Sequence, residues 1–286
     1  RYFGGKAQTV EKQTRVKARV KAHAFKELLE NKDKVIIMGH KMLDMDAFGA
    51  AIGIWRIATH LNKKAYILRS DVNPSVRPMI EKFKAPEYPE DLFMSEEKAL
   101  NSLTNDSLVV VVDVNRPSIT EGPSLLKKAK NIVVLDHHRK SSEIITNATL
   151  SYVETFASSA CEMVSEIVQY ISDDIKLKTL EADAMYAGIV IDTQNFNVQT
   201  GARTFEAAAF LKRKGADITS VRKMFREDAA DYLAKAEAIH NAEIYENYYA
   251  ISECDSANTA SPTLVCAQAA NDLLNIKGIK ASFVLT

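Results

Sequence analysis

The sequence contains few cysteines and no closely spaced pair of them. Its three cysteines, Cys161, Cys254 and Cys266, are widely separated in a chain of 286 residues, and no CxxC motif occurs. Disulfide-stabilised small domains and zinc ribbons both depend on paired cysteines. We therefore expect free thiols and exclude these two classes of protein.

The sequence also lacks long apolar runs and an excess of either charge. No apolar stretch reaches 18 residues, so we expect no membrane-spanning helix within this sequence. The 37 basic residues balance the 37 acidic ones, which leaves no global positive field for nonspecific binding of long DNA. Apolar residues nevertheless make up 47% of the chain, enough for the core of one large domain or two ordinary ones.

Short apolar segments alternate with amphipathic segments in the first half of the chain. Four segments are typical of buried strands, namely 34–40, 64–70, 107–114 and 131–138. Residues 47–61 have the apolar spacing of a helix and lie between the first two of these strands. The strand–helix–strand order predicts an α/β fold with a parallel sheet and helices on its faces.

The second half of the chain is more helical. Three segments have helical patterns, namely 158–171, 179–193 and 204–217. Ser159, followed three residues later by Glu162, predicts a helix cap rather than a nucleophile, and Gly215 is a plausible helix stop. A polar, alanine-rich stretch over 226–246 predicts a connecting helix. Residues 247–286 predict a strand, a helix and a strand of a smaller α/β domain.

Acids and histidines follow three of the predicted strands at the point where each strand ends. The first strand is followed by His40, Asp44 and Asp46, the third by Asp113, and the fourth by Asp136, His137 and His138. A single aspartate in such a place is most often a helix cap or a turn former. In open parallel sheets, however, ligands bind outside the carboxyl ends of the strands. We therefore expect these side chains to converge at one edge of the sheet.

The expected cluster has the composition of a metal site. Carboxylates held this close would repel one another and raise one another's pKa, and bound cations remove that repulsion. The ligands are oxygen and nitrogen without thiolate, which favours Mn²⁺ or a similar six-coordinate ion over structural zinc. Two such ions about 3.5–4 Å apart form a site for phosphoryl transfer, so the pattern points to a two-metal phosphoesterase.

Four motifs together resemble those of the DHH phosphoesterase superfamily. They are GHKMLDMDAFGA, VVVVDVN, VVLDHHRK and YAGIVIDTQNF, and they follow the order of the superfamily within residues 34–217. The segments SSACE and RTFEAAAFLKRKGAD resemble the GdpP type of cyclic di-AMP phosphodiesterase. This resemblance implies hydrolysis of cyclic di-AMP to linear pApA by in-line attack of a hydroxide that bridges two Mn²⁺ ions, with Co²⁺ or Mg²⁺ as substitutes. The implied substrates are cyclic and short linear dinucleotides.

The resemblance also implies roles for individual residues. One metal ion would be held by His40, Asp44 and Asp113, and the other by Asp46, Asp113, His137 and Asp192. Asp113 would therefore act on both ions, and Asp136 would orient a histidine through its ring N–H. His138 would face the phosphate and either stabilise charge or protonate the leaving oxygen, and Arg139 would contact the phosphate. Asp192 is assigned by the resemblance alone, because its segment also fits a capping aspartate.

The resemblance divides the chain into four parts. These are a linker and helix after a degenerate GGDEF-like domain (1–30), a DHH catalytic domain (31–225), the connecting helix (226–246) and the start of a DHHA1 substrate-binding domain (247–286). The glycine-rich loop near the end of that accessory domain is not in this sequence, so we expect the domain to be incomplete. We also expect a homodimer, and a membrane-anchored parent protein with upstream sensor domains and this region in the cytoplasm.

Other functions remain open at this point. Within the superfamily they are a nano-RNA or pAp phosphatase, a RecJ-like nuclease and a manganese pyrophosphatase. The neutral net charge counts against a long-DNA nuclease. The linker-like first residues count against a free-standing pyrophosphatase. A nucleotide sensor with an inactive catalytic domain is the non-enzyme alternative, and the presence of every implied metal ligand counts against it.

Overall fold

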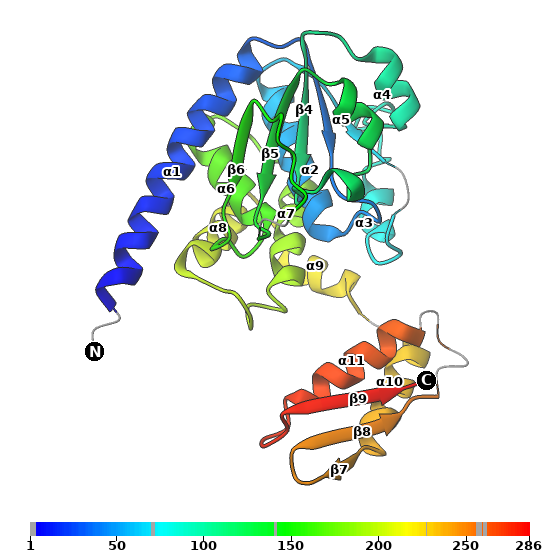
Figure 1. Cartoon of the computed structure of the whole chain (residues 1–286). Helices are drawn as coiled ribbons and strands as arrows, with labels where there is room; N and C mark the ends of the chain where they lie inside the picture. The colour runs from blue at the N-terminus through cyan, green and yellow to red at the C-terminus, as the bar shows by residue number, and fades with distance from the viewer. Residues whose placement is uncertain (1–3, 70–71, 140–141, 227, 256–258, 260–261) are drawn as a thin grey trace. The chain divides into compact units, whose positions relative to one another are not determined.

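A computed structural model of the protein describes residues 4–69, 72–139, 142–226, 228–255, 259 and 262–286. The chain forms two compact units, Arg1–Met224 and Phe225–Thr286, and each is described here by itself (Figure 1). Residues 1–3, 70 and 227, which fall within the predicted linker, strand and connecting helix, lie outside the described residues.

A six-stranded parallel sheet forms the centre of the first unit. Its strands are β1 (Lys34–Met38), β2 (Lys64–Leu68), β3 (Phe93–Met94), β4 (Ser107–Val112), β5 (Asn131–Asp136) and β6 (Leu150–Val153). They are arranged in the order β3-β2-β1-β4-β5-β6. β1, β4 and β5 lie in the middle of the sheet and are almost wholly buried, which explains their continuous apolar sequences. The predicted α/β fold with a parallel sheet is confirmed.

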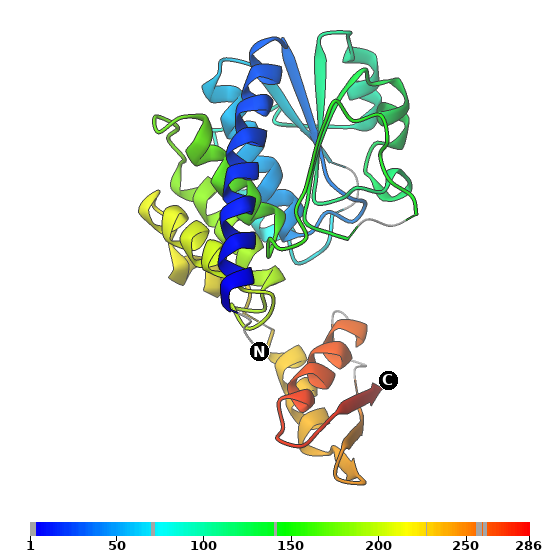
Figure 2. The same cartoon turned by 60° about the vertical axis from the view of Figure 1, so that its left-hand side comes forward.

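Helices cover both faces of this sheet (Figures 1 and 2). The helices of the first unit are α1 (Gly4–Glu30), α2 (Met45–His60), α3 (Arg77–Lys82), α4 (Glu96–Ser102), α5 (Pro123–Lys128), α6 (Ala160–Ile171), α7 (Thr179–Asp192), α8 (Ala202–Arg213) and α9 (Ile218–Met224). Ile36 and Met38 of β1 pack in one apolar cluster with residues of α4 and α5. On the other face, α2 lies against the sheet and packs closely against α6 and α7.

Two of the predicted helix ends have the expected residues. The Ser159 side chain accepts a hydrogen bond from the Glu162 N–H at 3.0 Å, so Ser159 caps α6 as predicted. Gly215 has a φ of +106° just after α8, a conformation that favours glycine, and it ends the helical segment as predicted. The helix extends over Ala202–Arg213, so it begins two residues before the predicted segment 204–217 and ends before that segment does.

Residues 4–30, within the predicted linker and helix, form one continuous helix. α1 extends over Gly4–Glu30 and packs on α6 through a stripe of buried side chains. That stripe consists of Ala18, Ala22, Phe25 and Leu29. Among the described residues, no helix combines the length and the apolar character needed to cross a bilayer, α1 included.

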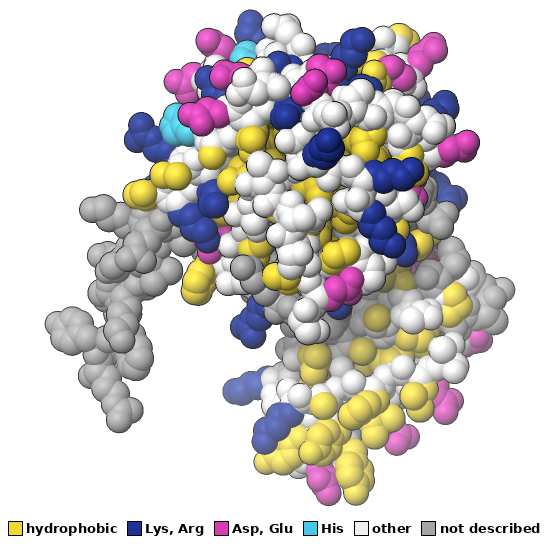
Figure 3. Space-filling model, turned by 45° about the horizontal axis from the view of Figure 1, so that its top comes forward, with side chains coloured by type: hydrophobic (Ala, Val, Ile, Leu, Met, Phe, Trp, Pro, Cys, Tyr) yellow, Lys and Arg dark blue, Asp and Glu magenta, His cyan; other side chains and the backbone are white. Residues whose placement is uncertain are grey.

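The second unit is a three-stranded sheet with two helices. Its elements are α10 (Ala229–His240), β7 (Glu243–Tyr245), β8 (Tyr249–Glu253), α11 (Pro262–Leu274) and β9 (Ala281–Leu285), with the strands in the order β7-β8-β9. Ser252 faces the helices, since its hydroxyl donates to the Ala238 carbonyl in α10. Ile251 and Phe283 pair on the opposite face and are exposed, and apolar side chains gather on this unit (Figure 3).

The prediction of one connecting helix over 226–246 is wrong at its carboxyl end. α10 ends at His240, and Glu243–Tyr245 forms an edge strand that pairs antiparallel with β8. Glu246 and Asn247 both have positive φ, at 51° and 61°, and they turn the chain back on itself. Pairing with β8 therefore overrides the local helical pattern in this stretch.

Candidate metal centre

The candidate site lies where β1, β4 and β5 end and where α2 and α6 begin. Asp44 is the N-cap of α2, and its side chain accepts a hydrogen bond from the Ala47 N–H at 3.0 Å. His40 lies four residues before it, with its Nε2 3.3 Å from the Asp44 Oδ2. The His40 Nε2 is also 3.6 Å from the Asp113 Oδ2, so these three residues from two strand ends form one group.

Asp46 is fixed by the first turn of another helix. Its carboxylate is fully buried and accepts the backbone N–H groups of Ala160 at 2.6 Å and Cys161 at 2.8 Å. These N–H groups lie at the amino end of α6, where the helix dipole favours a negative charge. The capping of α6 by Ser159 therefore also helps to orient a carboxylate of α2.

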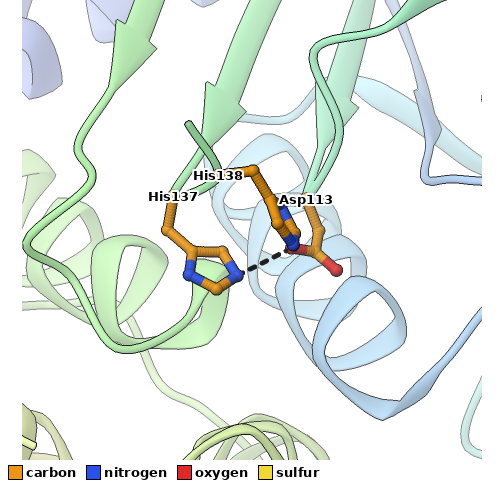
Figure 4. A group of neighbouring side chains, drawn as sticks. All are labelled: Asp113, His137 and His138. Carbon is orange, nitrogen blue, oxygen red and sulfur yellow. Dashed lines mark ion pairs between the residues drawn. The ribbon is translucent and has the colours of Figure 1, made fainter. Parts of the chain in front are cut away.

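Asp113 occupies the middle of the site. Its φ of 60° is unusual for a residue other than glycine, although aspartate tolerates it better than most. Its N–H still donates to the Leu135 carbonyl at 2.9 Å, which continues the pairing of β4 with β5 one residue past the end of β4. The Asp113 Oδ1 lies 3.1 Å from the His137 Nε2 and 3.5 Å from the His138 Nδ1 (Figure 4).

His137 connects Asp113 to two further acids. Its Nε2 lies 3.3 Å from the Asp192 Oδ2 and 3.8 Å from the Asp46 Oδ2. Asp192 is the last residue of α7, so the site combines strand ends, helix starts and one helix end.

The structure brings six of the predicted ligands into overlapping groups that could hold a metal ion. The groups are His40, Asp44 and Asp113; Asp46, His137 and Asp192; and Asp113, His137 and His138. In each group the ligand atoms lie within 4.8 Å of one another. Asp113 and His137 each belong to two groups, so the arrangement could hold neighbouring cations.

Two buried atoms in this cluster lack hydrogen-bond partners in the described part of the chain. They are the Asp113 Oδ1 and the His137 Nε2, whose 3.1 Å approach does not have the geometry of a hydrogen bond. A buried polar atom without a partner is costly, and a cation between these two atoms would satisfy both. Carboxylate and imidazole donors also suit divalent ions such as Mn²⁺. The residues present therefore fit a metal site.

The pKa values of the acids reflect the same crowding. Burial raises the pKa of Asp113 well above its ordinary value, and the nearby charge of Asp46 raises it further. Burial together with the charge of Asp192 raises the pKa of Asp46 to about 7. These carboxyl groups are therefore poorly stabilised as anions by the protein alone, as expected for groups that share a cation.

The pKa values of two histidines are raised as well, which in their case favours the charged form. Burial lowers the pKa of His137, but its short contacts with the carboxylates of Asp113 and Asp192 and the charge of Asp46 outweigh burial and raise that pKa to about 11. For His40, burial is likewise outweighed, chiefly by Asp44, and its pKa rises to about 9. Protons therefore compete with metal ions for these imidazoles, and metal binding would displace them.

The histidine that Asp136 contacts is His138. The fully buried Asp136 carboxylate lies with its Oδ1 2.8 Å from the His138 Nδ1 and accepts the His138 N–H at 3.2 Å. Burial raises the pKa of Asp136, but the His138 contacts outweigh it and the pKa is lowered. Asn115, which the sequence analysis did not single out, donates from Nδ2 to the other oxygen of Asp136.

A cavity of about 450 Å³ opens beside the ligand groups. It is lined by His40, Asp44, Asp113, Val114, Asn115, Arg116, Ile119, His138, Arg139 and Asp192. Arg139, for which a phosphate contact is predicted, lines this cavity. Arg116 is a second basic residue of the lining, and the sequence analysis missed it. The available signal was its position, three residues after Asp113 at the same strand end.

Close packing of α2 against α7 holds Asp46 in its place. A Cβ on Gly188 of α7 would come within 2.5 Å of the Cys161 Sγ and 2.9 Å of the Asp46 Cα. A Cβ on Gly49 of α2 would meet the Ala184 carbonyl oxygen at 2.5 Å. The two glycines let the helices approach so closely that backbone lies beside backbone next to the site.

Comparison with known proteins links this geometry to a family. Residues 34–189 match the family described as DHH family, N-terminal domain. A cyclic-di-AMP phosphodiesterase GdpP of Geobacillus thermodenitrificans is 42% identical over 291 residues, which cover 100% of this chain and 44% of that protein. The GdpP phosphodiesterase of Bacillus subtilis is 38% identical over 288 residues, with the same coverage. The chain thus spans less than half the length of these relatives.

A solved structure supports the fold. The crystal structure of an exopolyphosphatase-related protein from Bacteroides fragilis matches with a TM-score of 0.75. The match covers 91% of this chain and 77% of that one, at 17% sequence identity. At this identity the likeness concerns the fold alone, and it includes the α/β arrangement that positions the site.

Proposed function

The chain belongs to the DHH family, and on this basis we propose that it is a two-metal phosphodiesterase that opens cyclic di-AMP to linear pApA. The observation that carries the proposal is that Asp113 belongs to two possible ligand groups, one that includes His40 and one that includes His137. The similarity to two GdpP phosphodiesterases supports the choice of cyclic di-AMP as the substrate.

Each side chain has a role in this proposal. One divalent ion would be held by His40, Asp44 and Asp113, and a second by Asp46, Asp113, His137 and Asp192. Such a pair, with Mn²⁺ as the first choice and Co²⁺ or Mg²⁺ as substitutes, supplies a nucleophilic hydroxide at neutral pH and neutralises charge on the reacting phosphate. The protein fixes the ligands through the α2 cap, the amino end of α6 and the backbone turn at Asp113.

The cavity beside the ligand groups gives room for the phosphate. Arg139 and Arg116 line it and would bind the phosphate oxygens, since arginine matches their geometry. His138 lines the same cavity with 57% of its side chain exposed, so it can reach a substrate that the buried His137 cannot. His138 would protonate the leaving 3′ oxygen or stabilise its charge.

The wider setting is part of the proposal. We propose that this region faces the cytoplasm in a longer, membrane-anchored protein with upstream sensor domains, that it acts as a homodimer, and that 247–286 begins a substrate-binding domain. Fractionation of cells that express the full gene product, with protease accessibility from each side of the membrane, would test the location.

The activity is tested by following product formation from cyclic di-AMP, pApA and pyrophosphate side by side. We expect pApA from cyclic di-AMP with added Mn²⁺ and no turnover after treatment with a chelator. Preferred cleavage of pApA would favour a nano-RNA or pAp phosphatase, and preferred cleavage of pyrophosphate a pyrophosphatase. Tight binding of cyclic di-AMP without turnover, in protein loaded with Mn²⁺, would favour a nucleotide sensor.

A further inference from the structure

Asn115 makes a buried contact that none of the roles above explains. Its side chain is 5% exposed, and its amide Nδ2 donates to the Oδ2 of the fully buried Asp136. The other oxygen of Asp136, Oδ1, accepts the His138 N–H and lies 2.8 Å from the His138 Nδ1. Both carboxylate oxygens are thus engaged by neighbouring residues, in the order Asn115, Asp136, His138.

This contact fixes the protonated nitrogen of the His138 ring. A carboxylate oxygen only accepts hydrogen bonds, so the His138 Nδ1 must carry the hydrogen that points at Asp136. The same Nδ1 lies 3.5 Å from the Asp113 Oδ1, the position from which it could otherwise join a metal-ligand group. A protonated ring nitrogen cannot bind a metal ion. His138 is therefore withheld from the metal and keeps its Nε2 for another partner.

We infer that Asn115 is a positioning residue which, by holding Asp136, leaves the His138 Nε2 to protonate the leaving oxygen of the substrate. The inference rests on the proposed phosphodiesterase function. Water first loses a proton to solvent, and the oxygen of the resulting hydroxide bonds to phosphorus. The bond from phosphorus to the 3′ oxygen breaks with its electron pair on that oxygen, and the His138 Nε2 gives that oxygen a proton. The ring is left neutral with its hydrogen on Nδ1, and it regains the proton from solvent.

The amide donor of Asn115 matters because the fully buried Asp136 cannot form a hydrogen bond with solvent instead. If the amide donor is lost, the buried Asp136 Oδ2 is left without a partner, which is unfavourable. The carboxylate would turn toward other donors and release the His138 ring. Because proton transfer matters most when the leaving oxygen is a poor leaving group, the loss should depend on the substrate.

The test replaces the donor of Asn115 and compares two leaving groups. In Asn115→Asp an acceptor replaces the donor at the same size, and in Asn115→Ala the donor is removed without an added charge. We expect kcat for cyclic di-AMP and for diphenyl phosphate, both with poor leaving groups, to fall about 10- to 100-fold. KM should stay within about threefold, because the lost interaction forms in the transition state. Hydrolysis of bis-p-nitrophenyl phosphate, which has a good leaving group, should change little.

Two comparisons separate this role from a structural one. Asn131→Asp makes the same chemical change at the start of β5, far from Asp136 at the end of that strand. The Asn131 side chain donates to the Asn105 and Ser107 carbonyls. This variant should keep the leaving-group dependence of the wild type. In a His138→Ala background, Asn115→Ala should cause no further loss, since the two residues act as a unit. Metal content of both Asn115 variants should match wild type.

The inference is overturned if the Asn115 variants keep wild-type kcat on the poor leaving groups. It is equally overturned if they lose activity on all three substrates to the same degree, lose metal, or add fully to His138→Ala. A wild-type enzyme that cleaves aryl diesters but not cyclic di-AMP would refute the proposed substrate instead, and the two aryl diesters would still decide the role of Asn115.

Discussion

At the scale of single residues, Asp113 combines an unusual backbone with a central position. Its positive φ turns the carboxylate out of the β4 direction toward His40 and His137. Asparagine tolerates the same left-handed conformation, whereas alanine does so less well. A change to asparagine therefore removes the charge and keeps the backbone turn.

We predict that Asp113→Asn and His138→Ala lose activity in different ways. Asp113→Asn should lose bound metal, and its activity should fall by more than about 100-fold. A loss of up to about 100-fold is typical when a residue that only supports a metal ligand is removed. His138→Ala should lower kcat and keep its metal, because its Nδ1 is already engaged by Asp136. Elemental analysis after gel filtration, together with kcat, measures both effects. Equal metal loss in the two variants would contradict this division of roles.

At the scale of elements, patterns local in sequence were predictable and pairings distant in sequence were not. The apolar runs of β1, β4 and β5 predict buried strands, and the acids that follow these strands can be expected at one edge of the sheet. The short β6 and the edge strand β7 have no such run, because partly exposed strands need not be apolar throughout. The contact of Asn115 with Asp136 was not predictable either, since it depends on the register of β4 beside β5.

The close approach of α2 and α7 gives a prediction for Gly188→Ala. The added methyl would strike the Cys161 Sγ and the Asp46 backbone, so we expect a loss of about 1–3 kcal/mol in the free energy of unfolding. Displacement of Asp46 should also weaken metal binding. Gly201→Ala is the matched control: a Cβ there meets nothing within 4 Å, so its cost should be below about 1 kcal/mol. Similar metal affinity in the two variants would argue that α7 does not position Asp46.

Helix α1 should be part of the core of the first unit. Phe25 is fully buried, so Phe25→Ala should lower the free energy of unfolding by about 3–5 kcal/mol. Val20 lies on the same helix but is 60% exposed, and Val20→Ala should change it by less than about 0.5 kcal/mol. Urea denaturation followed by circular dichroism measures both. If Phe25→Ala costs no more than Val20→Ala, α1 is not anchored by its buried stripe.

At the scale of the whole molecule, the proposed chemistry falls within one of the two units. Every predicted metal ligand, from His40 to Asp192, belongs to the unit Arg1–Met224. The first unit also has its own core, in which the central strands pack against helices on both faces. Metal binding should therefore depend on the first unit, whatever the second contributes to the choice of substrate.

We therefore predict that a shortened chain of residues 1–224 binds Mn²⁺ as the whole chain does. At a free concentration 100 times the dissociation constant, each bound ion should stabilise the folded unit by about 2.7 kcal/mol, because the ion binds the assembled ligands and not the unfolded chain. Calorimetry of both chains with and without Mn²⁺ measures this stabilisation. Asp113→Asn in the shortened chain is the control, and it should lose most of the shift. A shortened chain that folds but gains no stability from Mn²⁺ would mean that residues beyond Met224 complete the metal centre.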